Sequence, residues 1–222
     1  MGFLPSPKGV GEQMLRPSKK LLLAATVLLL LSFPSSPSAK PDFRKSIANF
    51  GDMHPDGTLH NFCSAWAVAD DGDELRTYWV TAAHCIIERD DNGLPTTADY
   101  RIGGEKAYLL KLDDKVDLAI LEGPTAPGLR IAYSEPKMRQ KVFAFTYFLP
   151  DGFYSEGVAS TQDSRGYNWF NLTAGPGSSG SAVLSLDADL VVGIVQFGPC
   201  PYPCSAVGGI SVKTLRAFVY GE

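Results

Sequence analysis

Histidine is scarce in this sequence, and basic clusters and long helical patterns are missing from it. Of the 222 residues only three are histidine and four are cysteine. No lysine- or arginine-rich run follows the N-terminal region, and the formal net charge is −4, so the sequence lacks the electrostatic footprint of a nucleic-acid-binding protein. No internal repeat or sustained heptad pattern occurs, which excludes a solenoid or a coiled coil.

An apolar run near the N-terminus is shorter than a typical membrane span. It covers residues 21–33, about 13 residues against the ~20 that a spanning helix needs. Lys19 and Lys20 precede it and small residues follow it, so we predict a secretory signal peptide over residues 1–39, with Met14 as an alternative start. A secreted or periplasmic protein is therefore expected. The alternative is a chain held at the membrane by an uncleaved apolar run.

The four cysteines favour disulfides over a metal site, because an exported chain folds in an oxidising compartment. Three connectivities are possible, and the spacing favours Cys63–Cys85 and Cys200–Cys204. Cys200 and Cys204 have no histidine or second cysteine pair nearby, so no metal is expected there. No cofactor is expected either.

The glycine and proline content predicts many short strands joined by turns. The chain has 22 Gly and 16 Pro, with β-branched and aromatic residues spread throughout. A polar entry segment covers 40–50, a hairpin covers 62–69 and 76–82, and a short helix closes the chain at 212–220. An acidic turn, 70–74, lacks the glutamate that a calcium loop needs at its twelfth position. Further strands are predicted near 100–103, 106–112, 117–121, 141–148, 153–160, 167–173, 181–186, 190–197 and 206–212.

These elements predict one all-β domain over residues 40–222, with two barrel-like halves. The Pro/Gly-rich stretch 123–128 is the expected seam between the halves. A monomer is expected.

One histidine is placed for chemistry. Peptide hydrolysis near neutral pH needs a nucleophile, a base poised near pH 7 and donors for the developing oxyanion. His54 and His60 lie in a polar, Gly/Pro-containing segment and are expected at the surface, whereas His84 follows an apolar strand and precedes Cys85. A bond from Cys85 to Cys63 would limit the movement of the imidazole. The alternative is a buried histidine beside a structural disulfide.

Four segments resemble motifs of the trypsin/chymotrypsin family of serine peptidases. In chain order they are similar to the family's histidine motif, its aspartate motif, its nucleophile motif and the strand that pairs with substrate: Val80-Thr-Ala-Ala-His-Cys85, Asp117-Leu-Ala-Ile-Leu121, Gly177-Ser-Ser-Gly-Ser-Ala182 and Val192-Gly-Ile-Val-Gln-Phe-Gly198. The resemblance covers roughly residues 45–220. It implies two six-stranded antiparallel β-barrels and a short C-terminal helix.

The resemblance also implies roles for particular residues. Ser179 would attack the scissile carbonyl, His84 would carry its proton, and Asp117 would hold the imidazole. The backbone N–H groups of Gly177 and Ser179 would form the oxyanion hole. The order His, Asp, Ser excludes an α/β-hydrolase, which runs Ser, Asp/Glu, His. The expected activity is that of a secreted serine endopeptidase acting on polypeptides through an acyl-enzyme. The alternative is a catalytically inactive relative that serves as a binding module.

Two departures from the family pattern bear on activation and specificity. Ser178 stands where pancreatic-type relatives place an aspartate, so no N-terminal activation switch is expected, and the chain is more similar to bacterial and viral members, including the glutamyl endopeptidases. By offset from Ser179, the primary pocket is expected at Thr173, Val195, Gln196, Phe197 and Gly198. No carboxylate falls among these residues, which implies an uncharged pocket for small or medium apolar side chains.

Overall fold

The computed structural model describes residues 42–53, 56–69, 77–86, 99–147, 149, 151–198 and 205–222. The predicted signal peptide, the acidic turn at 70–74, and the pair Cys200 and Cys204 lie outside these residues. Within the described part of the chain, no helix is long and apolar enough to cross a membrane.

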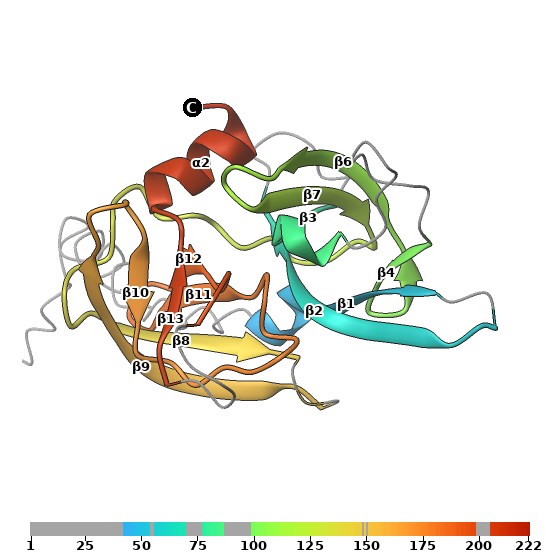
Figure 1. The fold of residues 1–222 in the computed structure, drawn as a ribbon, viewed down its shortest axis with the longest axis horizontal. Coiled ribbons are helices and arrows are strands. Elements are labelled where there is room, and N and C mark those ends of the chain that lie inside the picture. The colour runs from blue at the N-terminus through green and yellow to red at the C-terminus, as the bar shows by residue number, and fades with distance from the viewer. Residues whose placement is uncertain are drawn as a thin grey trace, which may run out of the picture. The chain divides into compact units, whose positions relative to one another are not determined.

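The first half of the domain is a curled antiparallel sheet in the order β5-β4-β1-β2-β3-β7-β6 (Figure 1). The predicted hairpin is confirmed as β2 and β3, with Trp66 opposite Val80. Among the residues that the structure describes, this half has seven strands rather than the expected six, because a two-residue strand forms between β4 and β6. The strands are β1 (Ile47–Met53), β2 (Leu59–Val68), β3 (Thr77–Thr81), β4 (Tyr100–Ile102), β5 (Glu105–Lys106), β6 (Tyr108–Asp113) and β7 (Leu118–Gly123).

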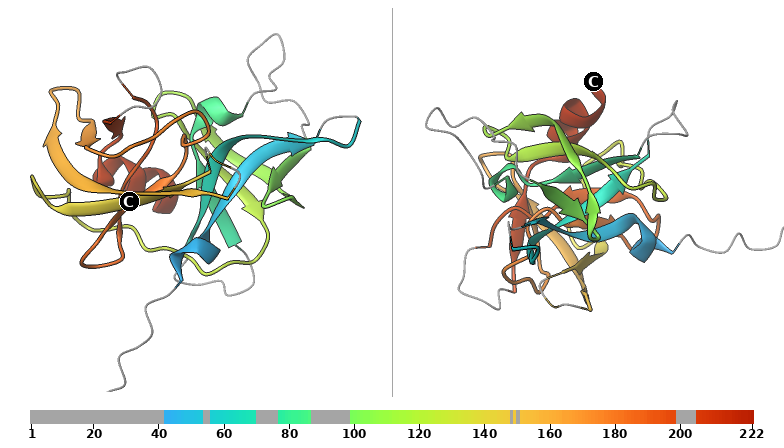
Figure 2. Two further views of the ribbon diagram at one scale, coloured as in Figure 1. Left: turned by 90° about the horizontal axis from the view of Figure 1, so that it is seen from below. Right: turned by 90° about the vertical axis from the view of Figure 1, so that its right-hand side faces the viewer.

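The second half is a six-stranded antiparallel sheet in the order β12-β11-β8-β9-β10-β13. The two sheets lie side by side (Figure 2), so the expected all-β class with two barrel-like halves is confirmed. The strands are β8 (Lys141–Thr146), β9 (Phe153–Gln162), β10 (Asn168–Phe170), β11 (Ala182–Ser185), β12 (Val191–Ile194) and β13 (Val207–Gly209).

The predicted closing helix is confirmed as α2 (Val212–Tyr220). Ser211 caps its first turn by accepting a hydrogen bond from the Thr214 N–H, and Gly221 ends it in the left-handed conformation. Leu215 and Phe218 bury the apolar face of the helix. Two short 3₁₀ helices, η1 (Phe43–Ser46) and η2 (Ala83–Cys85), complete the described helices.

The prediction of a polar entry segment at 40–50 is wrong for most of its length, because residues 43–50 form a 3₁₀ helix and part of a strand. It contains η1 and the start of β1, which pairs with β2 from Ile47 to Met53. Ile47 and Phe50 are fully buried by this pairing. The strand was missed because its partner lies farther along the chain and its own sequence does not alternate clearly.

The described residues form two hydrophobic cores, one of which joins the halves. One lies within the first sheet around Phe50, Trp79 and Leu121. The other fills the second sheet and also takes in Trp66 and Val80 from the first. The two sheets therefore share apolar contacts, and a residue of one can be held against a residue of the other.

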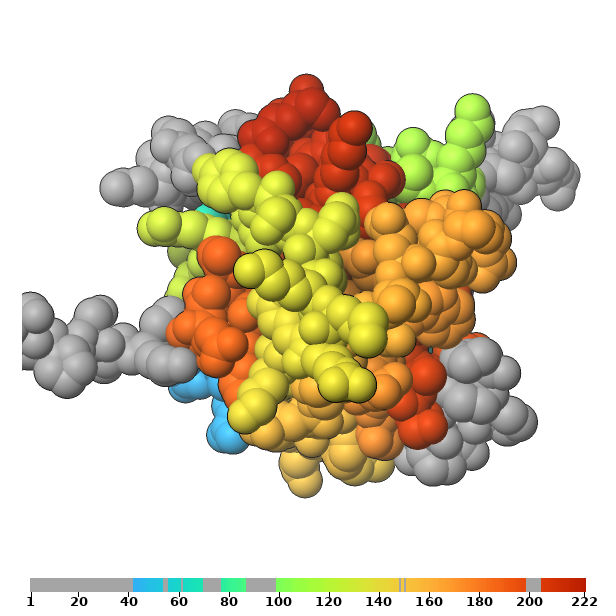
Figure 3. Space-filling model, turned by 90° about the vertical axis from the view of Figure 1, so that its left-hand side faces the viewer, coloured from blue at the N-terminus to red at the C-terminus, as the bar shows by residue number. Residues whose placement is uncertain are grey.

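The segment between β7 and β8 crosses the outside of the molecule, where its yellow surface lies beneath α2 (Figure 3).

Candidate active site

His84 lies in η2, directly after β3, and a disulfide fixes its neighbour. Cys85 is bonded to Cys63 of β2, with 6.2 Å between the Cα atoms, which confirms the first predicted pair. Both cysteines are buried, whereas the His84 side chain is 46% exposed. The short loop therefore presents the imidazole to solvent from a rigid base.

The Asp117 carboxylate binds both the backbone N–H and the imidazole ring of His84. The carboxylate accepts a hydrogen bond from the His84 N–H at 2.9 Å, and its two oxygens lie 2.9 and 3.1 Å from Nδ1. Because a carboxylate only accepts, Nδ1 carries a proton in this arrangement and Nε2 is left as an acceptor. This is the tautomer that a general base requires.

Asp117 lies just outside the strand predicted at 117–121, because β7 begins at Leu118. It precedes β7 in the left-handed conformation, with φ of 54°, and its side chain is 32% exposed. Aspartate tolerates this conformation better than most residues. The carboxylate is satisfied by the two N–H groups of His84, so it does not depend on full burial.

The segment before Ser179 is a tight turn. The Ser178 N–H donates to the Gly175 carbonyl at 2.9 Å, with Pro176 and Gly177 between them. Proline in the second position and a glycine with φ of 95° in the third are typical of a type II turn. The Ser178 hydroxyl, 1% exposed, accepts the Gly175 N–H at 3.0 Å and closes the turn from inside.

Most peptide groups of this loop are already hydrogen-bonded. The Gly177 carbonyl accepts from the Ser64 hydroxyl, the Ser179 carbonyl from the Ser64 N–H, and the Gly180 N–H donates to the Val195 carbonyl at 2.7 Å. Among the described residues, the N–H groups of Gly177 and Ser179 donate no hydrogen bond. These are the two donors that the family resemblance implies for an oxyanion hole.

Ser64 connects this loop to the strand that carries the disulfide. It is fully buried, donates its N–H to the Ser179 carbonyl at 2.8 Å and donates its hydroxyl to the Gly177 carbonyl at 2.8 Å. The hydroxyl also accepts the Tyr147 N–H, and its carbonyl accepts the Thr81 hydroxyl. Sequence reasoning missed Ser64, although a hydroxyl in an apolar strand must find a buried partner.

The loop at 175–180, which carries the predicted nucleophile Ser179 and is called the nucleophile loop below, therefore packs against the end of β3, three residues before His84. A Cβ atom on Gly180 would overlap the Ser64 carbonyl and the Thr81 hydroxyl, and would lie 3.1 Å from the Ala82 nitrogen. Ser179 itself is partly buried, and its hydroxyl makes no hydrogen bond to any described residue, His84 included. The structure joins His84 to Asp117 directly, and it joins Ser179 to them through Ser64 and β3.

The five predicted pocket residues have different environments. Val195 and Gln196 are 3% and 5% exposed, while Thr173 and Phe197 are partly buried and Gly198 is exposed. The Phe197 ring packs edge-on against Tyr167 and Trp169, with centroids 5.1 and 5.3 Å away. The pocket assignment of these residues stays a prediction.

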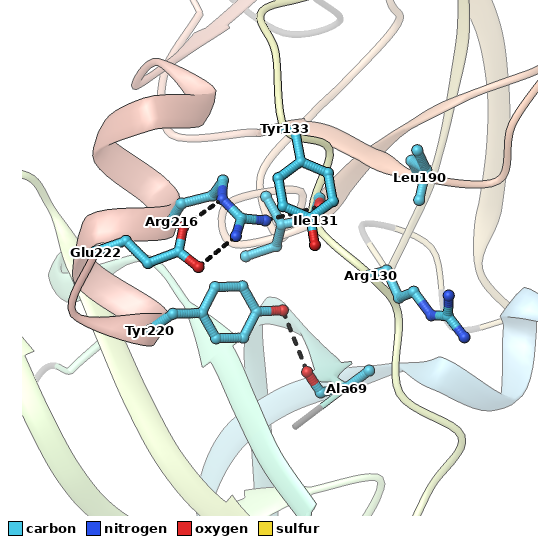
Figure 4. Close-up of a pocket in the computed structure, with 8 residues that line it drawn as sticks. All are labelled: Ala69, Arg130, Ile131, Tyr133, Leu190, Arg216, Tyr220 and Glu222. Carbon is cyan, nitrogen blue, oxygen red and sulfur yellow. Dashed lines mark hydrogen bonds and ion pairs between the residues drawn. The ribbon is translucent and has the colours of Figure 1, made fainter. Parts of the chain in front are cut away.

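Two surface hollows lie apart from these residues. One, of about 470 Å³, is bordered by Arg216, whose guanidinium lies over the Tyr133 ring and binds Glu222 (Figure 4). The other, of about 540 Å³, runs between Lys115, Arg165 and Lys213. Neither is lined by His84, Ser179 or a predicted pocket residue, so the hydrogen-bond geometry, rather than the size of a hollow, locates the candidate active site.

Comparisons with known proteins identify the family and the fold. The family model described as trypsin-like peptidase domain matches residues 63–194, which include the three motif residues. Among solved structures, the fold is similar to the crystal structure of the serine endoprotease from Yersinia pestis, with a TM-score of 0.59 and 20% sequence identity. The match covers 80% of this chain and 63% of that chain, so this chain spans less than two thirds of that protein. No curated protein matches the sequence.

Proposed function

This chain belongs to the family of trypsin-like peptidase domains, and on that premise we propose that it is a serine endopeptidase whose catalytic residues are His84, Asp117 and Ser179. The observation that carries the proposal is the pairing of His84 Nδ1 with the Asp117 carboxylate at 2.9 Å. It leaves Nε2 as the acceptor for a serine proton. The hydroxyl of Ser179 has no competing hydrogen bond among the described residues.

The proposed reaction has two balanced halves. Ser179 Oγ attacks the scissile carbonyl carbon while its proton moves to His84 Nε2, and the carbonyl oxygen becomes an oxyanion held by the N–H groups of Gly177 and Ser179. His84 then gives the proton to the leaving amine as the C–N bond breaks, which leaves an acyl-enzyme. Water attacks this ester with His84 as the base, the C–O bond to Ser179 breaks, His84 returns the proton to Ser179 Oγ, and the new carboxylic acid end of the cleaved peptide leaves. Asp117 stabilises the imidazolium in both halves.

Several properties beyond the family assignment are part of the proposal. Polypeptides are the proposed substrates, and secretion follows from the predicted signal peptide at residues 1–39. The buried Cys63–Cys85 disulfide supports folding in an oxidising compartment. The Ser178 hydroxyl is neutral and is hydrogen-bonded within its own turn. This supports the proposal that the loop is ordered without the new N-terminal ammonium group that activates pancreatic-type relatives.

The alternative is a catalytically inactive relative that only binds peptides. A fluorophosphonate probe separates the two, because it reacts covalently only with an activated serine. The full chain is produced in an oxidising compartment as the wild type, Ser179→Ala and Ser160→Ala, the last being a change at an exposed serine in β9.

Labelling of the wild type and of Ser160→Ala, with none in Ser179→Ala, is the expected result. Turnover of a peptide library should fall by about 10³-fold or more in Ser179→Ala, as in other triads. A folded wild type that neither labels nor cleaves would favour the binding module.

A further inference from the structure

Gln196 has a buried side chain whose hydrogen bonds lead to the catalytic aspartate. Its Nε2 donates to the Val116 carbonyl at 2.8 Å and to the Asp117 carbonyl at 2.7 Å. Its Oε1 accepts the Ile210 N–H at 2.8 Å. With 5% of its surface exposed, Gln196 has little capacity left to contact a substrate.

The orientation of this amide follows from its partners. Two carbonyl oxygens face Nε2 and one N–H group faces Oε1. The reversed amide would place an oxygen against two carbonyls and an NH₂ group against an N–H. Glutamine is therefore suited to this position as a double donor and single acceptor.

The carbonyls that Gln196 binds belong to the short turn between β6 and β7. Asp117 is the last residue of that turn, has φ of 54°, and binds His84 through its carboxylate. A residue in the left-handed region keeps that conformation only where its surroundings hold it. The carboxamide of Gln196, in the segment that follows β12, supplies two such contacts.

The residue before Gln196 holds the nucleophile loop. The Val195 carbonyl accepts the Gly180 N–H at 2.7 Å, and the Val195 N–H donates to the Ser181 carbonyl at 2.9 Å. Residues 195 and 196 therefore bind the turn that carries Asp117 and the loop that carries Ser179 at adjacent positions of one chain segment.

We propose that Gln196 is a positioning residue, which sets the place of Asp117 relative to Ser179, and that its side chain does not line the primary pocket. This inference rests on the proposed function. A positioning residue changes the rate for all substrates alike, whereas a pocket residue changes the ratio between substrates with different side chains before the cut.

The test compares Gln196→Met, Gln196→Glu and Gln140→Met in the full chain. Methionine has a similar shape without the hydrogen bonds, and glutamate keeps an acceptor for Ile210 while losing the donor. Gln140 is the matched control, because its amide binds Ser185 and Lys137 and no residue of the site. Thermal melts establish that each variant is folded.

In both Gln196 variants, kcat should fall about 10- to 100-fold by the same factor for peptides with different residues before the cut, with KM changed by less than about threefold. Gln140→Met should keep the wild-type kcat. A change in the ratio between substrates, with kcat retained for the best of them, would overturn the proposal in favour of a pocket role.

A spectroscopic measurement keeps this test separate from the proposed function. In protein labelled with ¹⁵N-histidine, the Nδ1 proton of His84, which binds the Asp117 carboxylate, should resonate far downfield. It should move upfield or broaden in the Gln196 variants but not in Gln140→Met. An unchanged resonance in a folded Gln196→Met variant refutes the positioning role even if the wild type proves inactive. A shifted resonance in an inactive protein refutes only the proposed function.

Discussion

Removing the Ser64 hydroxyl is the most direct way to test how the nucleophile loop is held. Ser64→Ala deletes one oxygen atom that donates to the Gly177 carbonyl and accepts the Tyr147 N–H. The backbone bond from Ser64 to the Ser179 carbonyl remains. The change therefore loosens the peptide between Gly177 and Ser178 without removing a reacting group.

The expected cost follows from the two partners left behind. Each orphaned group in a partly buried site costs about 1–3 kcal/mol, so Ser64→Ala should lower the free energy of unfolding by roughly 2–6 kcal/mol. Losing an oxyanion donor outright costs about 3–4 kcal/mol of transition-state stabilisation. Because Ser64→Ala only frees the peptide next to that donor, we expect kcat to fall about 10-fold, or ~1.4 kcal/mol.

Urea unfolding and kcat on one peptide substrate measure the two effects. Thr77→Val is the control, since it removes a buried hydroxyl that accepts the Ala126 N–H at the far end of β3. It should lower stability by about 1–2 kcal/mol and leave kcat unchanged. A Ser64→Ala protein with wild-type kcat, or a Thr77→Val protein that loses as much activity, would refute the reasoning.

Three further predictions follow from other contacts. Cys85→Ser should lower the free energy of unfolding by about 3 kcal/mol in the chain-entropy model for the loop that it closes, and denaturation with and without reductant measures this. Gly180→Ala should abolish activity, because φ is 84° and the added Cβ overlaps β2 and β3. Gly104→Ala, with φ of 87° and open space around the Cβ, should lower the free energy of unfolding by only about 1 kcal/mol. Equal effects of the two changes on urea unfolding and on kcat would contradict this. Burial of the Asp163 carboxylate acts to raise its pKa, but hydrogen bonds led by the Arg165 guanidinium lower the pKa to about 2. Asp163→Asn should therefore lower the melting temperature at pH 7, and the deficit should shrink as the pH falls below about 4 towards 2; a deficit independent of pH would sink this explanation.

Local pattern was sufficient for the elements whose partners are near in sequence. The spacing of apolar residues predicts the helix at 212–220 with its observed bounds, and the Ser211 cap and the Gly221 stop that the structure shows are also local to the sequence. The β2–β3 hairpin was predicted for the same reason. Strand β1 was missed, since the burial of Phe50 depends on pairing with both β2 and β4.

The motifs alone predict the residues that would carry the chemistry. His84, Asp117 and Ser179 were predicted from residue type, order and neighbours, and the structure places the first two in hydrogen-bond contact. The spacing of Cys63 and Cys85 favoured the observed disulfide over other pairings. The signal peptide and the second cysteine pair remain predictions.

The sequence by itself determined which residues can carry a proton, attack a carbonyl or close a turn, because those properties belong to the side chain and its immediate neighbours. Only the tertiary structure decided what holds them in place. Ser64 and Gln196 are ordinary polar residues in the linear sequence, and their roles arise from partners 113 and 79 positions away. A buried polar group must bond to whatever the fold brings beside it, and that neighbour is set by the packing of two sheets, which no local pattern encodes.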